Sequence, residues 1–171
     1  MKRELARRLE SVSDFADPSA DLEQYQTPTE LAATLVHLAS LHDDLAGRTV
    51  VDLGSGTGML ALGAAFASPD RVVGIEIDSG AIRQARGNER EMEPPVSIDW
   101  VRGDATRPPL SVDETTVLMN PPFGAQNGHR HADRQFLSAA VSIAAVSYSI
   151  HNEGSRSFVE SFAEDNGGEV T

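Results

Sequence analysis

The residues best suited to chemistry each follow a short apolar segment. Asp52 precedes a turn that contains Gly54 and Gly56, and Glu76 lies about 20 residues beyond that turn. Glycine lets a ligand approach the backbone closely, and a carboxylate at the position of Glu76 can accept both hydroxyls of a ribose. Asp104 can accept a hydrogen bond from an adenine amino group, although an isolated loop aspartate more often caps a turn. Together these residues predict a site for an adenosine.

The glycine spacing narrows the class of ligand. Gly54, Gly56 and Gly58 form a Gly-x-Gly-x-Gly pattern. A dinucleotide fingerprint would need a glycine where Met59 stands, and a phosphate-binding Walker loop would need a Gly-Lys-Ser/Thr sequence that this chain lacks. A glycine turn can also be purely structural, so the prediction depends on Glu76 and Asp104.

The segment Asn120-Pro121-Pro122-Phe123 could activate an amino group. The lone pair of an aniline-like nitrogen is delocalised into its ring, and the Asn120 Oδ1 and the Pro121 carbonyl can each accept one amino hydrogen and so favour a pyramidal nitrogen. Proline fixes φ and removes a donor, which holds these acceptors still. Phe123 offers a face for base stacking. By composition alone, a double proline after a strand is usually just a turn.

Strands that alternate with helices must position these residues. The apolar pattern predicts a parallel, doubly wound Rossmann-like α/β sheet with right-handed crossovers. The predicted strands are 49–53, 71–77, 96–101, 115–119 and 147–150, and the predicted helices between them are 59–67, 81–90 and 134–145. We expect a single domain, with a helical part over 1–48 and the Rossmann-like core over 49–171.

The N-terminal part is predicted to contain two helices. Leu5, Leu9 and Val12 have helical spacing, and a second helix starts at Thr27 or Pro28. The basic flank of the first helix is a candidate RNA clamp, which consists of Lys2, Arg3, Arg7 and Arg8.

The charge of the chain is unusual for a protein that binds nucleic acid. Acidic residues outnumber basic ones 26 to 14, the net charge is −12, and Lys2 is the only lysine. This composition resembles that of proteins from salt-loving archaea. At about 1 M salt the Debye length is about 3 Å, so the acidic surface would repel RNA little. An ordinary acidic mesophilic protein is the alternative.

The composition also excludes several classes of protein. The chain has no cysteine and its five histidines show no ligand spacing, so we expect no metal. No apolar run approaches the roughly 18 residues of a membrane span, and no signal peptide is evident. We therefore expect a soluble, cytoplasmic enzyme with no membrane partner.

Four segments together carry a resemblance to a known family. They are Leu22-Glu23-Gln24-Tyr25-Gln26-Thr27-Pro28, Asn120-Pro121-Pro122-Phe123-Gly124, the Asp133…Phe136-Leu137 segment and Tyr148-Ser149-Ile150-His151. With the glycine turn, Glu76 and Asp104, they resemble the small archaeal and eukaryotic adenine-N6 methyltransferases of small-subunit ribosomal RNA. Gln26 replaces the proline of many relatives, and Ser55 and Thr57 replace cysteines of some.

The resemblance implies S-adenosyl-L-methionine as the cofactor and ribosomal RNA as the substrate. It places Asp52 beside the methionine part of the cofactor, and it gives Gln24, Tyr25 and Thr27 cofactor-side roles. Release-factor glutamine methyltransferases share the Asn-Pro-Pro motif but usually end it with tyrosine, so Phe123 argues mildly against that alternative. A catalytically silent binding module is the second alternative.

A protein partner is expected at the third strand, over 96–101. Val96, Ile98 and Trp100 alternate with polar residues, which indicates an edge strand, and the usual winding order 3-2-1-4-5 also places it at an edge. The family resemblance implies a small zinc-binding activator protein as a heterodimer partner, which we expect to add a strand along this edge. Trp100 itself is expected to pack rather than to stack on a base.

Three further features leave alternatives open. His129, Arg130, His131 and Arg134 could hold RNA phosphates or form an ordinary hydrophilic loop, and His151 could contact substrate or simply pack. The fold usually has two more strands after a helix that we expect around 158–166, so either the sheet is incomplete or the protein continues beyond Thr171.

Overall fold

The computed structural model describes residues 1–110, 114–122 and 132–171. Five parallel strands form one sheet in the order β3-β2-β1-β4-β5. The strands are β1 (Thr49–Leu53), β2 (Arg71–Glu76), β3 (Ile98–Arg102), β4 (Thr115–Met119) and β5 (Ala144–Ser149). The predicted doubly wound sheet is confirmed, and the third strand lies at an edge.

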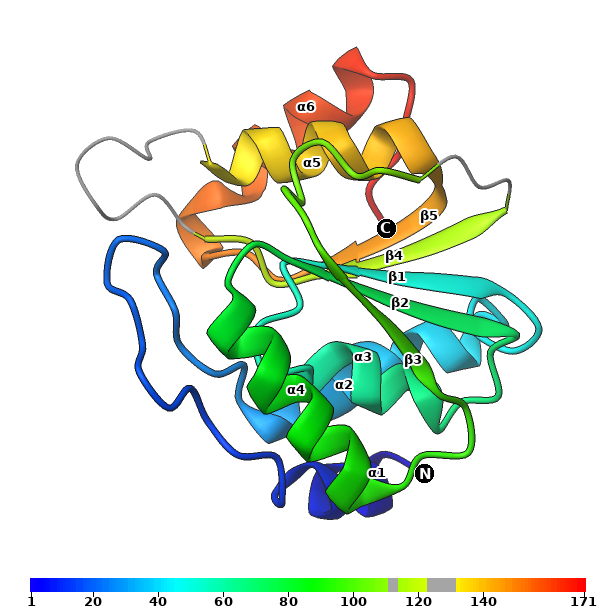
Figure 1. Ribbon diagram of the computed structural model, residues 1–171. Coiled ribbons are helices and arrows are strands. Elements are labelled where there is room, and N and C mark those ends of the chain that lie inside the picture. The colour runs from blue at the N-terminus through cyan, green and yellow to red at the C-terminus, as the bar shows by residue number, and fades with distance from the viewer. Residues whose placement is uncertain (111–113, 123–131) are drawn as a thin grey trace.

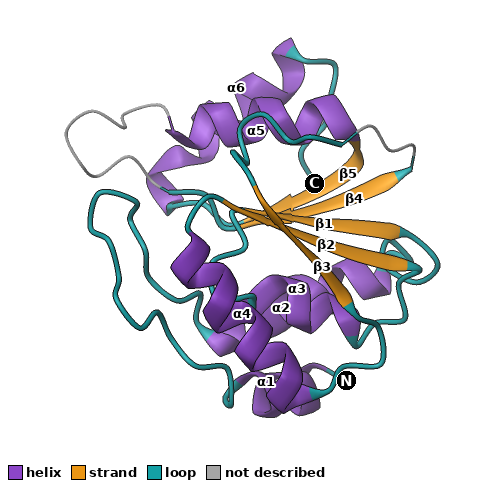
Figure 2. Cartoon of the chain, in the orientation of Figure 1, coloured by secondary structure: helices purple, strands orange, loops and turns teal. Residues whose placement is uncertain are grey.

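Helices cover both faces of the sheet (Figure 1). The elements α1 (Lys2–Leu9), α2 (Thr29–Leu41), α3 (Met59–Ala65) and α4 (Ser79–Met92) lie on one face, and α5 (Ala132–Ile143) and α6 (Arg156–Asp165) lie on the other (Figure 2). A short 3-10 helix, η1 (Glu153–Ser155), precedes α6. The described residues contain no helix long and apolar enough to cross a membrane.

Two hydrophobic clusters hold the layers together, one on each face of the sheet. On the first face, Leu9 of α1 and Val36 of α2 share a cluster with Leu62 of α3. On the second face, Leu137 and Phe162 pack with Val117 of β4. The two predicted N-terminal helices are therefore present, and they are built into the same core as the sheet.

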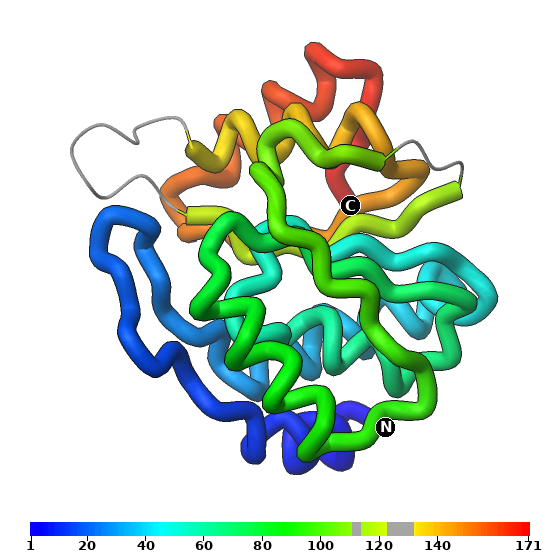
Figure 3. Tube along the Cα trace, in the orientation of Figure 1, coloured from blue at the N-terminus to red at the C-terminus, as the bar shows by residue number. Residues whose placement is uncertain are grey.

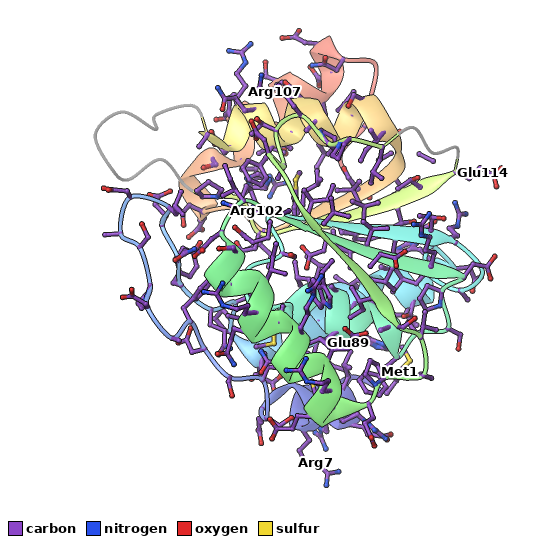
Figure 4. All side chains as sticks on the ribbon, in the orientation of Figure 1. Met1, Arg7, Glu89, Arg102, Arg107 and Glu114 are labelled. Carbon is purple, nitrogen blue, oxygen red and sulfur yellow. The ribbon has the colours of Figure 1, made fainter. Side chains whose placement is uncertain are left out.

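The edge strand β3 is fixed by Trp100 and Glu89. A β-carbon at Gly74 would lie 2.6 Å from the Trp100 ring, so a glycine in β2 makes room for the indole. Glu89 of α4 accepts hydrogen bonds from the Trp100 Nε1 at 2.7 Å and from the Ile98 backbone N at 2.8 Å. Trp100 is thus a packing residue, as predicted, and Figure 4 labels Glu89 next to this strand.

The segment between α1 and α2 runs along the carboxyl ends of the strands. The tube in Figure 3 follows it from the bottom of the molecule up and around to α2. Asn88 of α4 pins its start, since the Asn88 side chain bonds both the N and the O of Ser13. The same edge of the sheet carries the ends of β1, β2 and β4, where the predicted site residues stand.

Candidate active site

One cavity collects most of the predicted site residues. It has a volume of about 310 Å³, which falls in the range of small-molecule sites. Its lining includes the predicted residues Gln24, Tyr25, Thr27, Asp52, Gly54, Gly56, Glu76, Asp104, Asn120 and Pro122. Pro121 is buried beside them without lining the cavity, and Phe123 lies outside the described residues, as do His129, Arg130 and His131.

The glycine turn between β1 and α3 forms the floor of this cavity. Gly54 and Gly56 have φ values of +72° and +54°, which side chains rarely adopt. A β-carbon on Gly54 would lie 2.9 Å from the Phe136 ring, and one on Gly56 would lie 2.9 Å from the Phe15 ring. Both aromatic rings also line the cavity. The glycines are therefore required by close aromatic neighbours as well as by backbone conformation.

Glu76 ties this turn to the end of β2. Its Oε2 accepts the Gly56 N–H at 2.8 Å, and its Oε1 accepts the Asp78 N–H at 2.9 Å. Burial raises the pKa of the Glu76 carboxyl, and the backbone N–H groups of Asp78, Gly56 and Ile77 oppose the rise. A carboxylate has about four acceptor positions, so acceptor capacity remains for a ribose hydroxyl.

Asp52 is the most deeply buried carboxyl group of the site. It is 1% exposed and accepts the Ala61 N–H at 2.9 Å, which caps the first turn of α3. Burial raises the pKa of Asp52 to about 7, and the nearby Glu76 carboxylate adds to the rise. Two acidic groups therefore share a buried space that favours a cationic ligand group.

Asp104 lies in the loop after β3 with its acceptor positions occupied. Thr106 donates to Oδ1 through its backbone N at 2.9 Å and its hydroxyl at 2.6 Å, and Arg107 makes two bonds of 3.2 Å to Oδ2. The Thr106 hydroxyl and Arg107 hold the pKa of Asp104 below its usual value. The longer bonds, to the exposed Arg107, are those that an adenine amino group would most easily replace.

Gln24 fastens the N-terminal segment over the cavity. Its Oε1 accepts the Ser19 N–H at 2.8 Å, and its Nε2 donates to Asp78 Oδ2 at 2.8 Å. Asp78 also caps α4 by accepting the Gly80 N–H. The side-chain polar atoms of Gln24 are thus used to connect the segment to the end of β2, a structural role that its sequence position did not reveal.

Thr27 and Tyr25 of the same segment contact Asn120. The Asn120 Nδ2 donates to the Thr27 Oγ1 at 2.9 Å. Burial raises the pKa of the Tyr25 phenol, the Glu23 carboxylate adds to the rise, and the Asn120 amide beside it opposes the rise. The Asn120 Oδ1 is buried and has no hydrogen-bond partner in the described part of the chain. A buried, unpartnered acceptor is costly unless a ligand supplies a donor.

Sequence reasoning missed three contributors to this site. Phe15 stood in a turn-rich segment without any recognisable pattern, and Thr106 was one of several loop residues. Phe136 belongs to a motif that carries the family resemblance, which gives it no role of its own. Their roles depend on contacts between segments distant in sequence, so only the aromatic character of Phe15 and Phe136 could have drawn attention to them.

A family model and the sequences of known relatives all identify this chain as similar to methyltransferases. The model of the methyltransferase small domain matches residues 31–168. The rRNA N(6)-adenosine-methyltransferase Mettl5 of Drosophila melanogaster is 39% identical, with 92% of this chain and 76% of the relative covered. The zebrafish (Danio rerio) METTL5 is 36% identical, with 95% of this chain and 80% of the relative covered.

A solved structure supports the fold along nearly the whole chain. A protein from Pyrococcus horikoshii superposes with a TM-score of 0.88 at 39% identity, over 97% of this chain and 82% of that one. A match of this extent includes the N-terminal helices and the segment over the cavity. The cavity, the buried Asn120 acceptor and these similarities lead to one conclusion: the chain belongs to the methyltransferase small-domain family, in its rRNA adenine-N6 branch, and uses S-adenosyl-L-methionine as its cofactor.

Proposed function

We propose that this protein methylates the N6 nitrogen of an adenine in small-subunit ribosomal RNA. The observation that carries the proposal is the Asn120 Oδ1, which is buried and unpartnered while its own amide nitrogen is held by Thr27. The relatives named as rRNA N6-adenosine methyltransferases support the RNA substrate. The restriction to the small subunit rests on the motif resemblance alone.

The described residues fit the cofactor. Glu76 keeps acceptor capacity for a ribose hydroxyl, and Asp104 lines the cavity where an adenine amino group can compete with Arg107. Asp52 provides buried negative charge for the methionine ammonium. When bound, the cofactor supplies an electrophilic methyl group on a sulfonium.

The protein's own contribution is to hold and polarise the nucleophile. The Asn120 Oδ1 and the Pro121 carbonyl accept the two hydrogens of the adenine amino group, which localises its lone pair for in-line attack. The Thr27 contact keeps the Asn120 oxygen oriented, because the amide nitrogen is bonded on the other side. The acceptors stabilise the positive charge that develops on nitrogen, so no charged base is needed in the transfer itself, and the methylated nitrogen then releases one of its two protons to water.

Methyl transfer to isolated ribosomal RNA tests the proposal. Small-subunit RNA should acquire N6-methyladenosine from labelled cofactor, and large-subunit RNA should not. The release-factor alternative predicts labelling of a glutamine in a protein substrate instead, and a silent binding module predicts cofactor binding by calorimetry without any transfer. Either of these two results would overturn the proposal.

We also propose that a small zinc-binding activator pairs with the edge strand β3. Its location at the edge of the sheet supports this. The Gly103 N–H donates to the backbone carbonyl of Glu76 in β2. The Ile98 N–H instead donates to the side-chain carboxylate of Glu89 in α4. Backbone amides alternate in direction along a strand, so Trp100 and Arg102 direct their N–H groups away from β2.

That alternation decides which variant tests the pairing. Ser97 and Asp99 are the polar residues that alternate with Val96, Ile98 and Trp100, but the alternation of amides directs the Asp99 N–H toward β2, so a proline there would break the sheet instead of testing its edge. Arg102→Pro removes an outward donor at an exposed position. It should abolish co-purification of the partner and leave cofactor binding intact. A complex that survives this substitution in size-exclusion chromatography would contradict strand pairing at this edge.

A further inference from the structure

Six of the eight described cations that form no ion pair lie on two helices, α1 and α4, and the other two are Arg102 of β3 and Arg134 of α5. Five arginines of the described residues form ion pairs, and these are Arg8, Arg48, Arg71, Arg107 and Arg156. The arginines on α4, namely Arg83, Arg86 and Arg90, form none, although acidic residues outnumber basic ones 26 to 14. An acidic surface would be expected to neutralise exposed arginines, so this row stands out.

The three arginines form one stripe on the outward face of α4. They are exposed, and their spacing of three and four residues places them on one side of the helix. Ala81, Ile82, Ala85 and Asn88 are buried on the opposite side. Glu89 of the same helix is turned toward β3 and bonds Trp100 and Ile98. Asp78 lies near Arg83, and Asp99 lines the same hollow as Arg86 and Arg90, but none of the three guanidinium groups is held in an ion pair.

The stripe begins close to the cavity and leads away from it. Asp78, the N-cap of α4, bonds Gln24 of the segment over the cavity. At its other end α4 is joined through Asn88 to Ser13, just after α1, and α1 carries the basic cluster Lys2, Arg3, Arg7 and Arg8. Figure 1 shows α4 descending from the carboxyl edge of the sheet toward α1, and Figure 4 shows Arg7 pointing away from the body of the molecule.

The chemistry of the stripe favours a polyanion over a protein partner. Protein interfaces have an apolar centre, and none of the exposed large apolar side chains in the described part of the chain lies on α4. Arg83 and Arg90 are seven residues apart, or about 10 Å along the helix axis. A nucleic-acid strand carries one phosphate per about 3.4 Å of its axis, so about three phosphates match this length.

We propose that Arg83, Arg86 and Arg90 form a phosphate-binding track that guides the RNA strand flanking the target adenine toward the cavity. This proposal rests on the proposed RNA substrate. It assigns a second RNA-binding surface, on α4, that is separate from the basic cluster on α1. It also explains how a protein with a net charge of −12 could hold RNA: the repulsive surface is interrupted where the strand must lie.

The test compares two triple variants of the full chain. Arg83→Gln, Arg86→Gln and Arg90→Gln together remove the track, and Arg48→Gln, Arg71→Gln and Arg156→Gln remove the same charge from ion-paired positions. Binding of a fluorescent 20-nucleotide single-stranded RNA is measured between 0.1 and 1 M salt. Circular dichroism and cofactor calorimetry verify that both variants are folded.

Loss of three phosphate contacts should reduce the slope of log Kobs against log salt by about 2, at about 0.7 per phosphate for single strands. The track variant should then bind RNA about 100-fold more weakly than the wild type at 0.1 M salt and nearly equally at 1 M. The matched variant should keep a slope close to that of the wild type. An unchanged slope in the track variant, or an equal loss in both variants, would overturn the proposal.

Two further readouts separate this proposal from the proposed function. Wild-type protein that binds RNA through the track but methylates no ribosomal RNA would refute the function and leave the track standing. A track variant that binds RNA normally but loses a co-purifying protein would make α4 a protein interface, which would also overturn the track.

Discussion

Replacing Asp52 with asparagine should change how the stability of the cofactor-free protein depends on pH. Asp52 is buried beside Glu76, and burial raises its pKa from 3.8 to about 7. The folded state therefore holds the Asp52 proton more tightly than the unfolded state does. This stabilisation is complete below pH 3.8 and is lost as the pH rises through 7. Asparagine has no such proton and can still accept the Ala61 N–H.

The magnitude follows from linkage between proton binding and folding. A rise of the Asp52 pKa from 3.8 to about 7 corresponds to about 4 kcal/mol across the full window. About 2.5 kcal/mol of this falls between pH 5 and pH 8.5. The free energy of unfolding of Asp52→Asn, relative to wild type, should therefore increase by roughly that amount over this interval. The raised pKa of Glu76 acts in the same direction in both proteins and largely cancels.

Urea denaturation at pH 5, 7 and 8.5, without cofactor and at fixed salt, measures this difference. Asp70→Asn is the matched control, because Asp70 is exposed and its loss also removes one negative charge. It should show little change in relative stability over the same interval. If the free energies of unfolding of Asp52→Asn and wild type differ by the same amount at pH 5 and at pH 8.5, the pKa of the buried Asp52 carboxyl is not raised and the reasoning is refuted.

The remaining predictions concern the site directly. Glu76→Ala should weaken cofactor binding by about 1–3 kcal/mol in calorimetry, because ribose acceptors are lost; unchanged affinity would remove Glu76 from the site. Asn120→Ala should bind cofactor normally and lose methyl transfer, and normal turnover would exclude Asn120 from the mechanism. Thr27→Val should lower kcat about tenfold, since one orienting hydrogen bond is lost, whereas Thr27→Ser should retain it; equal rates in both would contradict that positioning role.

The sequence alone predicted the architecture because the pattern of apolar residues is local. The strands 49–53 and 115–119 were predicted with the bounds that the structure shows, and the winding order correctly placed the third strand at an edge. The last strand was predicted at 147–150 but spans Ala144–Ser149, because the apolar run passes directly from α5 into β5 without a turn residue to mark the boundary. The alternation and helical periodicity of apolar residues therefore predict which strands and helices exist better than they predict the residues at which each one ends.

The sequence also identified the residues at the strand ends, since parallel strands bring their carboxyl ends to one edge. Asp52, Glu76, Asp104 and Asn120 accordingly meet at one cavity. What each polar atom does there was decided by tertiary structure. The Gln24 amide bonds both Ser19 and Asp78, and Asp78 is 54 residues away in the sequence. Thr27 orients Asn120, which is 93 residues away. Such pairings depend on how the loops fold over the sheet, and no local pattern encodes them.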